Sequence, residues 1–129
     1  MSIGKMLTLH PDVGGDVDEA HAAAARHAML CAAMCASCAD ACSAEHMDLR
    51  QCVRVCLDCS DVCHATSRLL SRQTGDNAKI RRAMLELCAH ACEACAEECS
   101  RHAHDHCRLC AEMCRECAQD CRRALAATC

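Results

Sequence analysis

The chain has 129 residues and a formal net charge of −4 at pH 7, and it contains eighteen cysteines but no phenylalanine, tryptophan or tyrosine. The length suits one domain. The lack of a basic block and of aromatic side chains that stack on bases argues against a nucleic-acid-binding protein.

The first sixteen residues are expected to form a flexible tail, followed by a single domain over residues 17–129. Pro11 and the Gly14–Gly15 pair discourage a helix in this tail. The segment also lacks the basic and then apolar pattern of a secretion signal. We therefore expect a cytoplasmic protein whose thiols are reduced.

Four helices are predicted, over residues 17–44, 48–71, 77–101 and 105–127. Asp16 with Glu19 resembles a capping box for the first helix, and Asp48 with Gln51 resembles one for the second. Residues 73–76 carry the clearest turn signal in the chain.

Cysteines recur along each predicted helix at intervals of three and four residues. At about 100° per residue this spacing places them on one face of a helix. Seventeen cysteines form four such stripes, namely Cys31, Cys35, Cys38 and Cys42; Cys52, Cys56, Cys59 and Cys63; Cys88, Cys92, Cys95 and Cys99; and Cys107, Cys110, Cys114, Cys117 and Cys121. Only Cys129 stands apart from them.

Four amphipathic helices with short links predict an all-α protein, an antiparallel up-down-up-down four-helix bundle with a cysteine-lined core. A helical solenoid is the competing architecture, but a solenoid does not need thiols on every inner face. Neighbouring cysteines on one helical face project in parallel, which suits a disulfide poorly. No apolar run reaches the roughly 18 residues that span a bilayer, so no membrane partner is expected.

The stripes indicate metal chemistry, because thiolates are soft ligands that favour Cu(I), Zn(II) and iron–sulfur clusters. Structural zinc sites usually take their cysteine pairs from loops, whereas these pairs lie on helices. Four thiolates around Zn(II) also leave a charge of −2 in a dry interior, whereas two around Cu(I) leave −1. We therefore predict many Cu(I) ions per chain. A Zn(II) or Cd(II) store and a thiol redox buffer remain the alternatives. No cysteine is set beside a histidine and an acid, so an enzyme is not expected.

The connectivity places the two links that contain His46, Met47, His102, His104 and His106 at one end of the bundle. We expect copper to enter and leave there, and the opposite end to be an apolar plug. The alternative is that these histidines are simply solvated. His104 precedes Cys107 by three residues and is a further candidate ligand. Met34 flanks the first stripe and is either core filler or a thioether ligand.

The four stripes resemble those of the bacterial copper storage proteins, in the cytosolic branch without an export signal. The resemblance covers residues 17–129. It implies a four-helix bundle that stores Cu(I) rather than catalysing a reaction, usually as a homotetramer. It also implies that all seventeen stripe cysteines bind copper, while Cys129 lies outside the pattern and its ligand role rests on its type alone.

Overall fold

The computed structural model describes residues 2–73 and 75–127, and within them the chain forms five helices. They are α1 (Ile3–Thr8), α2 (Glu19–Ser43), α3 (Arg50–Leu70), α4 (Ala78–Cys99) and α5 (Asp105–Ala127). The four long helices agree with the predicted ranges to within about two residues, as expected where helix ends fray. Cys129 lies outside the described residues.

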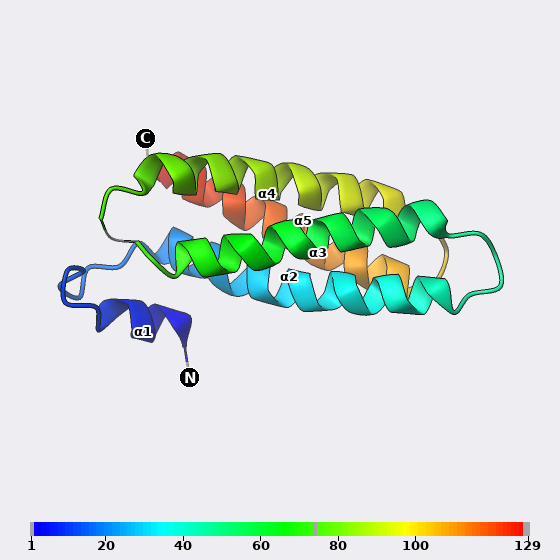
Figure 1. Ribbon diagram of the computed structural model, residues 1–129, viewed down its shortest axis with the longest axis horizontal. Helices are drawn as coiled ribbons and strands as arrows, with labels where there is room; N and C mark the ends of the chain where they lie inside the picture. Colours follow the sequence, from blue (N-terminus) through cyan, green and yellow to red (C-terminus); the bar gives the residue numbers. More distant parts are fainter. Residues whose placement is uncertain (1, 74, 128–129) are drawn as a thin grey trace.

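The four long helices stand side by side around one core. Each contacts the helix before and after it in the chain, and α2 also contacts α5, which closes the square. Figure 1 shows successive helices running in opposite directions, with the α2–α3 and α4–α5 links together at one end. The α3–α4 link lies at the opposite end, where the chain also begins and finishes. The predicted antiparallel four-helix bundle is confirmed.

The helix starts differ from the predicted capping boxes. The N-cap of α2 is Asp18 rather than Asp16, and its carboxylate accepts hydrogen bonds from the backbone N–H of Ala20 and His21. The α3 N-cap lacks a side-chain hydrogen bond. Asp48 instead accepts hydrogen bonds from the backbone N–H and the guanidinium of Arg50. It therefore stabilises the end of the α2–α3 link and does not form the predicted capping box.

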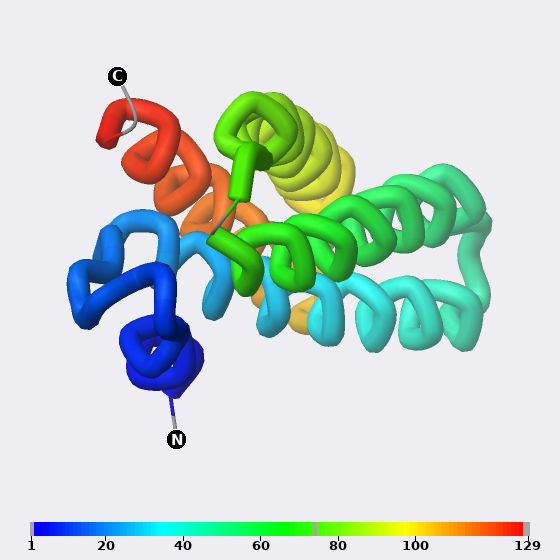
Figure 2. The backbone as a smooth tube through the Cα atoms, turned by 60° about the vertical axis from the view of Figure 1, so that its left-hand side comes forward, coloured from blue at the N-terminus to red at the C-terminus, as the bar shows by residue number. Residues whose placement is uncertain are grey.

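The N-terminal segment contains a helix, which Pro11 and the glycine pair were expected to discourage. Its helix α1 lies beside the first half of α2 (Figure 2). Leu7 of α1 is only 4% exposed, and Ala22 of α2 is 2% exposed. Gly14 and Gly15 adopt positive φ in the loop that follows, where a side chain would be strained. The division of the chain into a tail and a bundle remains a prediction.

The core is built almost wholly from cysteine and alanine, because every long helix turns its cysteine stripe inward. At the end of the bundle with the α3–α4 link, the core consists of leucines instead of cysteines. Leu70 and Leu85 are fully buried there, and Leu125 is nearly so. The apolar plug expected there is therefore made by these leucines, whereas Ile80 and Leu87 face outward.

By length and composition alone, α2 is apolar enough to cross a membrane, and it is the one such helix among the described residues. Half of its most apolar window is buried inside the bundle. The expectation that no apolar run reaches spanning length missed this helix, because its apolar character comes from alanines and cysteines interspersed with polar residues.

Candidate metal centre

The four stripes meet in a single column of sulfur atoms. All seventeen stripe cysteines are buried free thiols, and even Cys38, which has the largest exposed fraction, is only 3% exposed. Each stripe spans 12 or 15 residues, or about 16 to 21 Å of helix from its first cysteine to its last. The column therefore extends along much of the bundle, and its thiols are almost completely buried.

In the middle of the column, thiols of different helices approach to van der Waals distance. The Sγ of Cys35 lies 3.5 Å from that of Cys114 and 3.7 Å from that of Cys110, both on α5. Cys92 of α4 lies 3.5 Å from Cys63 and 3.8 Å from Cys59, both on α3. A metal ion placed between such pairs would tie neighbouring helices together.

Groups of four sulfurs recur along the column, with all four atoms within 4.8 Å of one another. Four of these groups are Cys31, Cys59, Cys63 and Cys92; Cys31, Cys35, Cys59 and Cys114; Cys35, Cys95, Cys110 and Cys114; and Cys38, Cys56, Cys99 and Cys110. Consecutive groups share one or two members. A thiolate that belongs to two groups can bridge two ions, which lowers the negative charge left on each ion.

At the end with the two links, the column finishes in a mixed group of Cys38, Cys42, Cys107 and His106. The Nδ1 atom of His106 lies 3.4 Å from the Sγ of Cys38 and 3.6 Å from that of Cys107. The Sγ of Cys42 lies 3.8 Å from that of Cys107. This group combines imidazole and thiol donors at the point where the dry core meets solvent.

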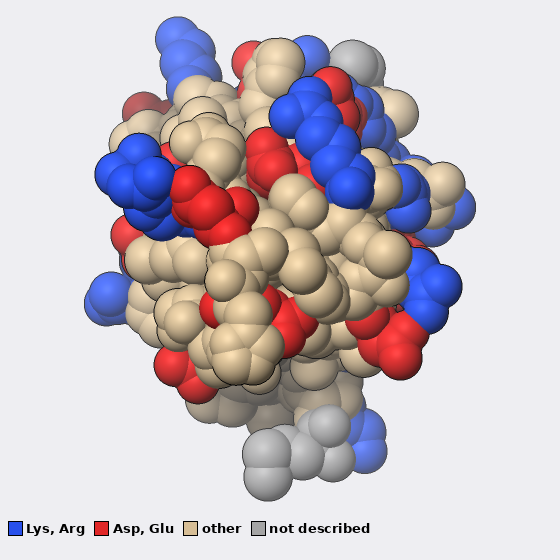
Figure 3. Space-filling model, turned by 90° about the vertical axis from the view of Figure 1, so that its right-hand side faces the viewer, with Lys and Arg blue, Asp and Glu red and all other residues tan. Residues whose placement is uncertain are grey.

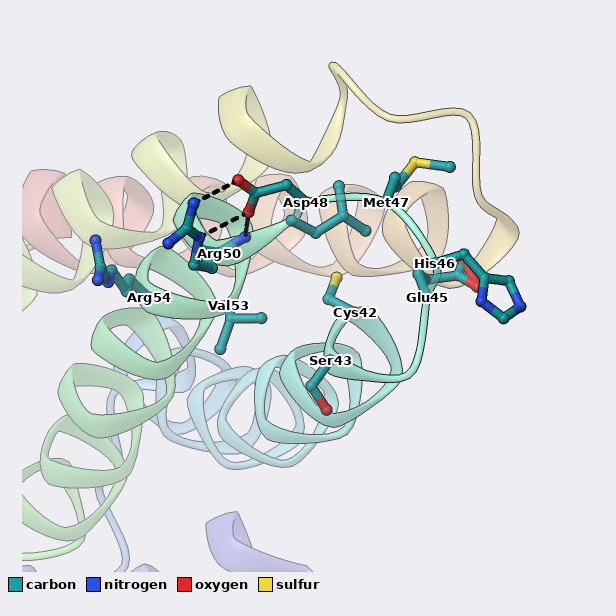
Figure 4. Close-up of a pocket in the computed structure, with 10 residues that line it drawn as sticks. Cys42, Ser43, Glu45, His46, Met47, Asp48, Arg50, Val53 and Arg54 are labelled. Atoms are coloured by element: carbon teal, nitrogen blue, oxygen red, sulfur yellow. Dashed lines mark hydrogen bonds and ion pairs between the residues drawn. The ribbon is translucent and has the colours of Figure 1, made fainter.

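A surface pocket of about 600 Å³ opens over this end. In Figure 4 the sulfur of Cys42 faces the space beneath the α2–α3 link, whereas the ring of His46 points away from the bundle. A smaller pocket of about 150 Å³ between α2 and α5 reaches Cys38 and Cys110 past Met34 and His106. Cys38 is thus approached from the side as well as from the end.

Burial keeps two thiols at this end, those of Cys107 and Cys42, neutral when no metal is bound. It raises the pKa of Cys107 to about 12, and it also raises the pKa of Cys42. The physical cause is the cost of placing a thiolate in a region of low dielectric constant. Copper must therefore displace a proton from each of these two thiols when it binds them.

Cys38 differs from its neighbours. Its hydrogen bond with Cys110 raises its pKa, but hydrogen bonds with Cys56, Cys99 and His106 oppose this and bring the pKa to about 6. The same contact with Cys38 raises the pKa of His106. A thiolate beside an imidazolium is therefore favoured at this end of the column.

His104 lies outside the sulfur column. Its Nδ1 is 2.7 Å from a carboxylate oxygen of Glu45, and its Nε2 is 3.3 Å from the Sδ of Met47. His102 pairs with Glu98 instead. Sequence reasoning singled out His104 because of its spacing from Cys107, but the ring that reaches the thiols belongs to His106. The sequence signal that could have identified His106 was its position next to Cys107, at the start of a cysteine stripe.

The chain matches known proteins over most of its length. Residues 17–126 match the profile of the copper storage protein family. The structure of the copper storage protein Ccsp from Streptomyces lividans, loaded with 10 copper equivalents, is 46% identical, with a TM-score of 0.91, covering 97% of this chain and 98% of that one. A structure of the cytosolic copper storage protein from the same organism, with five coppers, is 49% identical, with a TM-score of 0.81 and coverages of 84% and 93%.

A more distant likeness is to the Cu(I)-bound copper storage protein BsCsp3, at 32% identity and a TM-score of 0.70, covering 78% of this chain and 93% of that one. The search of curated sequences found no match. The length of the matches and their sequence identity agree with the geometry of the sulfur column. The chain therefore belongs to the copper storage protein family.

Proposed function

We propose that the protein stores Cu(I) at high capacity on the thiolates of its core. The observation that carries this proposal is the run of overlapping four-sulfur groups inside one dry column. Cu(I) is soft, monovalent and satisfied by two or three thiolates. Such a column can hold many Cu(I) ions with little uncompensated charge.

The seventeen stripe cysteines are proposed as the ligands, and His106 joins them at the end with the links. Each ion displaces thiol protons as it binds. Because consecutive groups share sulfur atoms, an ion can move inward by exchanging one ligand at a time. His104, the further candidate ligand, lies outside the column, beside Glu45 and Met47.

Anaerobic titration of the reduced protein with Cu(I), in competition with a chromophoric chelator, tests this proposal. With bridging thiolates the capacity approaches about one Cu(I) per cysteine, and without bridging about half of that. The titration should therefore continue well beyond a few equivalents. A capacity of only one or two ions would refute storage.

A thiolate store for Zn(II) or Cd(II) is the second candidate, because groups of four sulfurs also suit tetrahedral ions. Sharing of sulfurs between groups favours Cu(I), since four separate thiolates per divalent ion would leave each site doubly negative in the core. Loading with Zn(II) followed by addition of Cu(I) distinguishes the two. Complete displacement of zinc supports the copper proposal, and retention of zinc supports the alternative.

The remaining alternative is a thiol redox buffer. It would be supported if mild oxidation gave many reversible disulfides in a protein that takes up negligible metal. We infer instead a binding protein without catalytic activity, located in the cytoplasm like the relative described as cytosolic.

We also propose a homotetramer. Helix α2 leaves Met29 44% exposed and Leu30 48% exposed, next to small exposed residues that include Ala33. This surface supports close contact with a second copy. Sedimentation velocity should find an oligomer that Ala33→Arg reduces to smaller species. An unchanged sedimentation coefficient would place the contact elsewhere.

A further inference from the structure

The first and last of the four long helices, α2 and α5, meet along a seam that no link of the chain ties together. Each of the other contacts around the square joins two helices that are also consecutive in the chain. Within the described residues, α1 contacts α2 but not α5, so it does not fasten the seam either. The seam therefore depends on side-chain contacts alone, and local opening of a fold disrupts such contacts first.

A buried carboxylate spans this seam at the end with the α3–α4 link. Asp120 of α5 is 6% exposed, and its Oδ2 accepts a hydrogen bond from Nδ1 of His27 on α2. Its Oδ1 accepts one from the guanidinium of Arg123, 3.1 Å away on the same helix. Among the described residues, the contact of His27 with Asp120 is the one between α2 and α5 that involves a carboxylate.

Ion pairs on the surface differ from this contact. Figure 3 shows basic and acidic side chains lying next to one another around the end with the two links. Glu93 and Arg122 pair across α4 and α5, but their side chains are 47% and 50% exposed. Exposed pairs contribute little, because water competes for both charges. A carboxylate held away from water depends on its partners much more strongly.

Sulfur atoms face each other across the same seam. The Sγ of Cys31 on α2 lies 3.6 Å from that of Cys114 on α5, and the Sγ of Cys35 lies 3.7 Å from that of Cys110. His27 precedes Cys31 by about one helical turn. Between free thiols these contacts are weak. A Cu(I) ion bound by one sulfur from each helix would join α2 firmly to α5.

We propose that the α2–α5 seam opens and closes in the metal-free protein, that His27 and Asp120 form its latch, and that copper bound across the seam locks it closed. The part that involves copper rests on the proposed storage function. A ligand shifts an equilibrium between two states only through its greater affinity for one of them. Bridging copper binds the closed seam alone, so the latch and the copper each favour the state that the other needs.

The first test is pulse labelling of the reduced, metal-free, full-length protein with N-ethylmaleimide, with the modified cysteines located by mass spectrometry. Cys31 and Cys114 face each other across the seam, whereas Cys56 and Cys95 do so across α3 and α4. His27→Ala should label the seam pair about 10-fold faster, because the buried carboxylate loses a partner. The second pair should keep the wild-type rate.

Two matched variants isolate the latch from general stability. His27→Asn keeps an N–H donor in the place of Nδ1 and should label at the wild-type rate. Glu93→Gln breaks the exposed pair between two helices that are joined by a link, and it should accelerate neither pair of cysteines. Equal acceleration of all four cysteines in His27→Ala would indicate general unfolding and would overturn the latch.

The second test follows the seam by NMR of protein labelled with ¹³C at the methionine methyl groups. Met34 of α2 is half-buried in a small pocket that it shares with Leu109 of α5, whereas Met84 is half-buried on α4. In the metal-free protein, relaxation dispersion should detect exchange in the range of microseconds to milliseconds at Met34 but not at Met84. His27→Ala should increase this exchange, and loading with Cu(I) should abolish it.

The outcomes separate this inference from the storage proposal. A capacity of no more than two Cu(I) ions would refute storage, while faster labelling of the seam cysteines in His27→Ala would still establish the latch. Seam cysteines that label equally fast in His27→Ala and in the wild type would overturn the latch and leave storage intact. Exchange at Met34 that persists in the copper-filled protein would overturn the locking of the seam by copper.

Discussion

At the scale of single residues, the position of a cysteine in the column determines how many metal sites it serves. Cys35 is shared by two four-sulfur groups and lies within 4 Å of four other sulfurs, those of Cys31, Cys95, Cys110 and Cys114. Removing it would therefore disturb more than one ion.

We expect Cys35→Ala to lower the Cu(I) capacity by more than one ion per chain and the stability of the metal-free fold by about 1 kcal/mol, the cost of a small cavity. Chelator-competed titration and urea unfolding measure the two effects. The matched control is Ala39→Gly, a buried change in the same helix that removes no sulfur. Unchanged capacity in Cys35→Ala would show that this thiol is not a ligand.

At the scale of elements, the spacing of the cysteines predicts where each long helix lies. The residues at which a helix begins and ends depend on which neighbouring side chain caps it. The stripe spacing predicted all four long helices and the faces that they bury. Asp16 and Asp18 are both of an N-cap residue type near the start of α2, and only the folded backbone selects Asp18.

Replacement of this cap gives a direct prediction. Asp18→Ala should destabilise the metal-free protein by about 1 kcal/mol, because two backbone N–H groups of α2 lose their acceptor. Asp16→Ala is the control and should change the free energy of unfolding little. If the two substitutions lowered the free energy of unfolding equally in urea titrations, Asp18 would not be the N-cap of α2.

Contacts between distant segments were beyond sequence reasoning. Asp120 of α5 is only 6% exposed and pairs with His27 of α2 and with Arg123. The bundle topology placed the histidine-bearing links at one end correctly. Which histidine turns toward the thiols depends on the path of the links, and this path brings His106 to Cys38 and leaves His104 with Glu45 and Met47.

At the scale of the whole molecule, burial in the bundle holds some thiols, among them Cys42 and Cys107, in neutral form until metal arrives. Folding raises the pKa of Cys107 from 9.0 to about 12. The unfolded chain therefore loses its proton first as pH rises, and ionisation above pH 9 favours the unfolded state. The contribution of this thiol to the stability of the metal-free protein is complete below pH 9 and falls as pH rises from 9 toward 12.

Urea unfolding of the reduced, metal-free protein between pH 7.5 and about 11 should thus give midpoints that fall above about pH 9. The copper-loaded protein should keep its midpoint over the same range, because its thiolates are already deprotonated and bound. A midpoint in the metal-free protein that does not fall above pH 9 would contradict neutral buried thiols.

The most direct measurement is a crystal structure of the reduced protein loaded anaerobically with Cu(I), with copper located by anomalous scattering. We predict a column of copper ions inside the bundle, from the level of Cys63 to that of Cys42, each bound by two or three stripe sulfurs. Copper confined to the surface histidines, with the core sulfurs unoccupied, would contradict storage in the bundle.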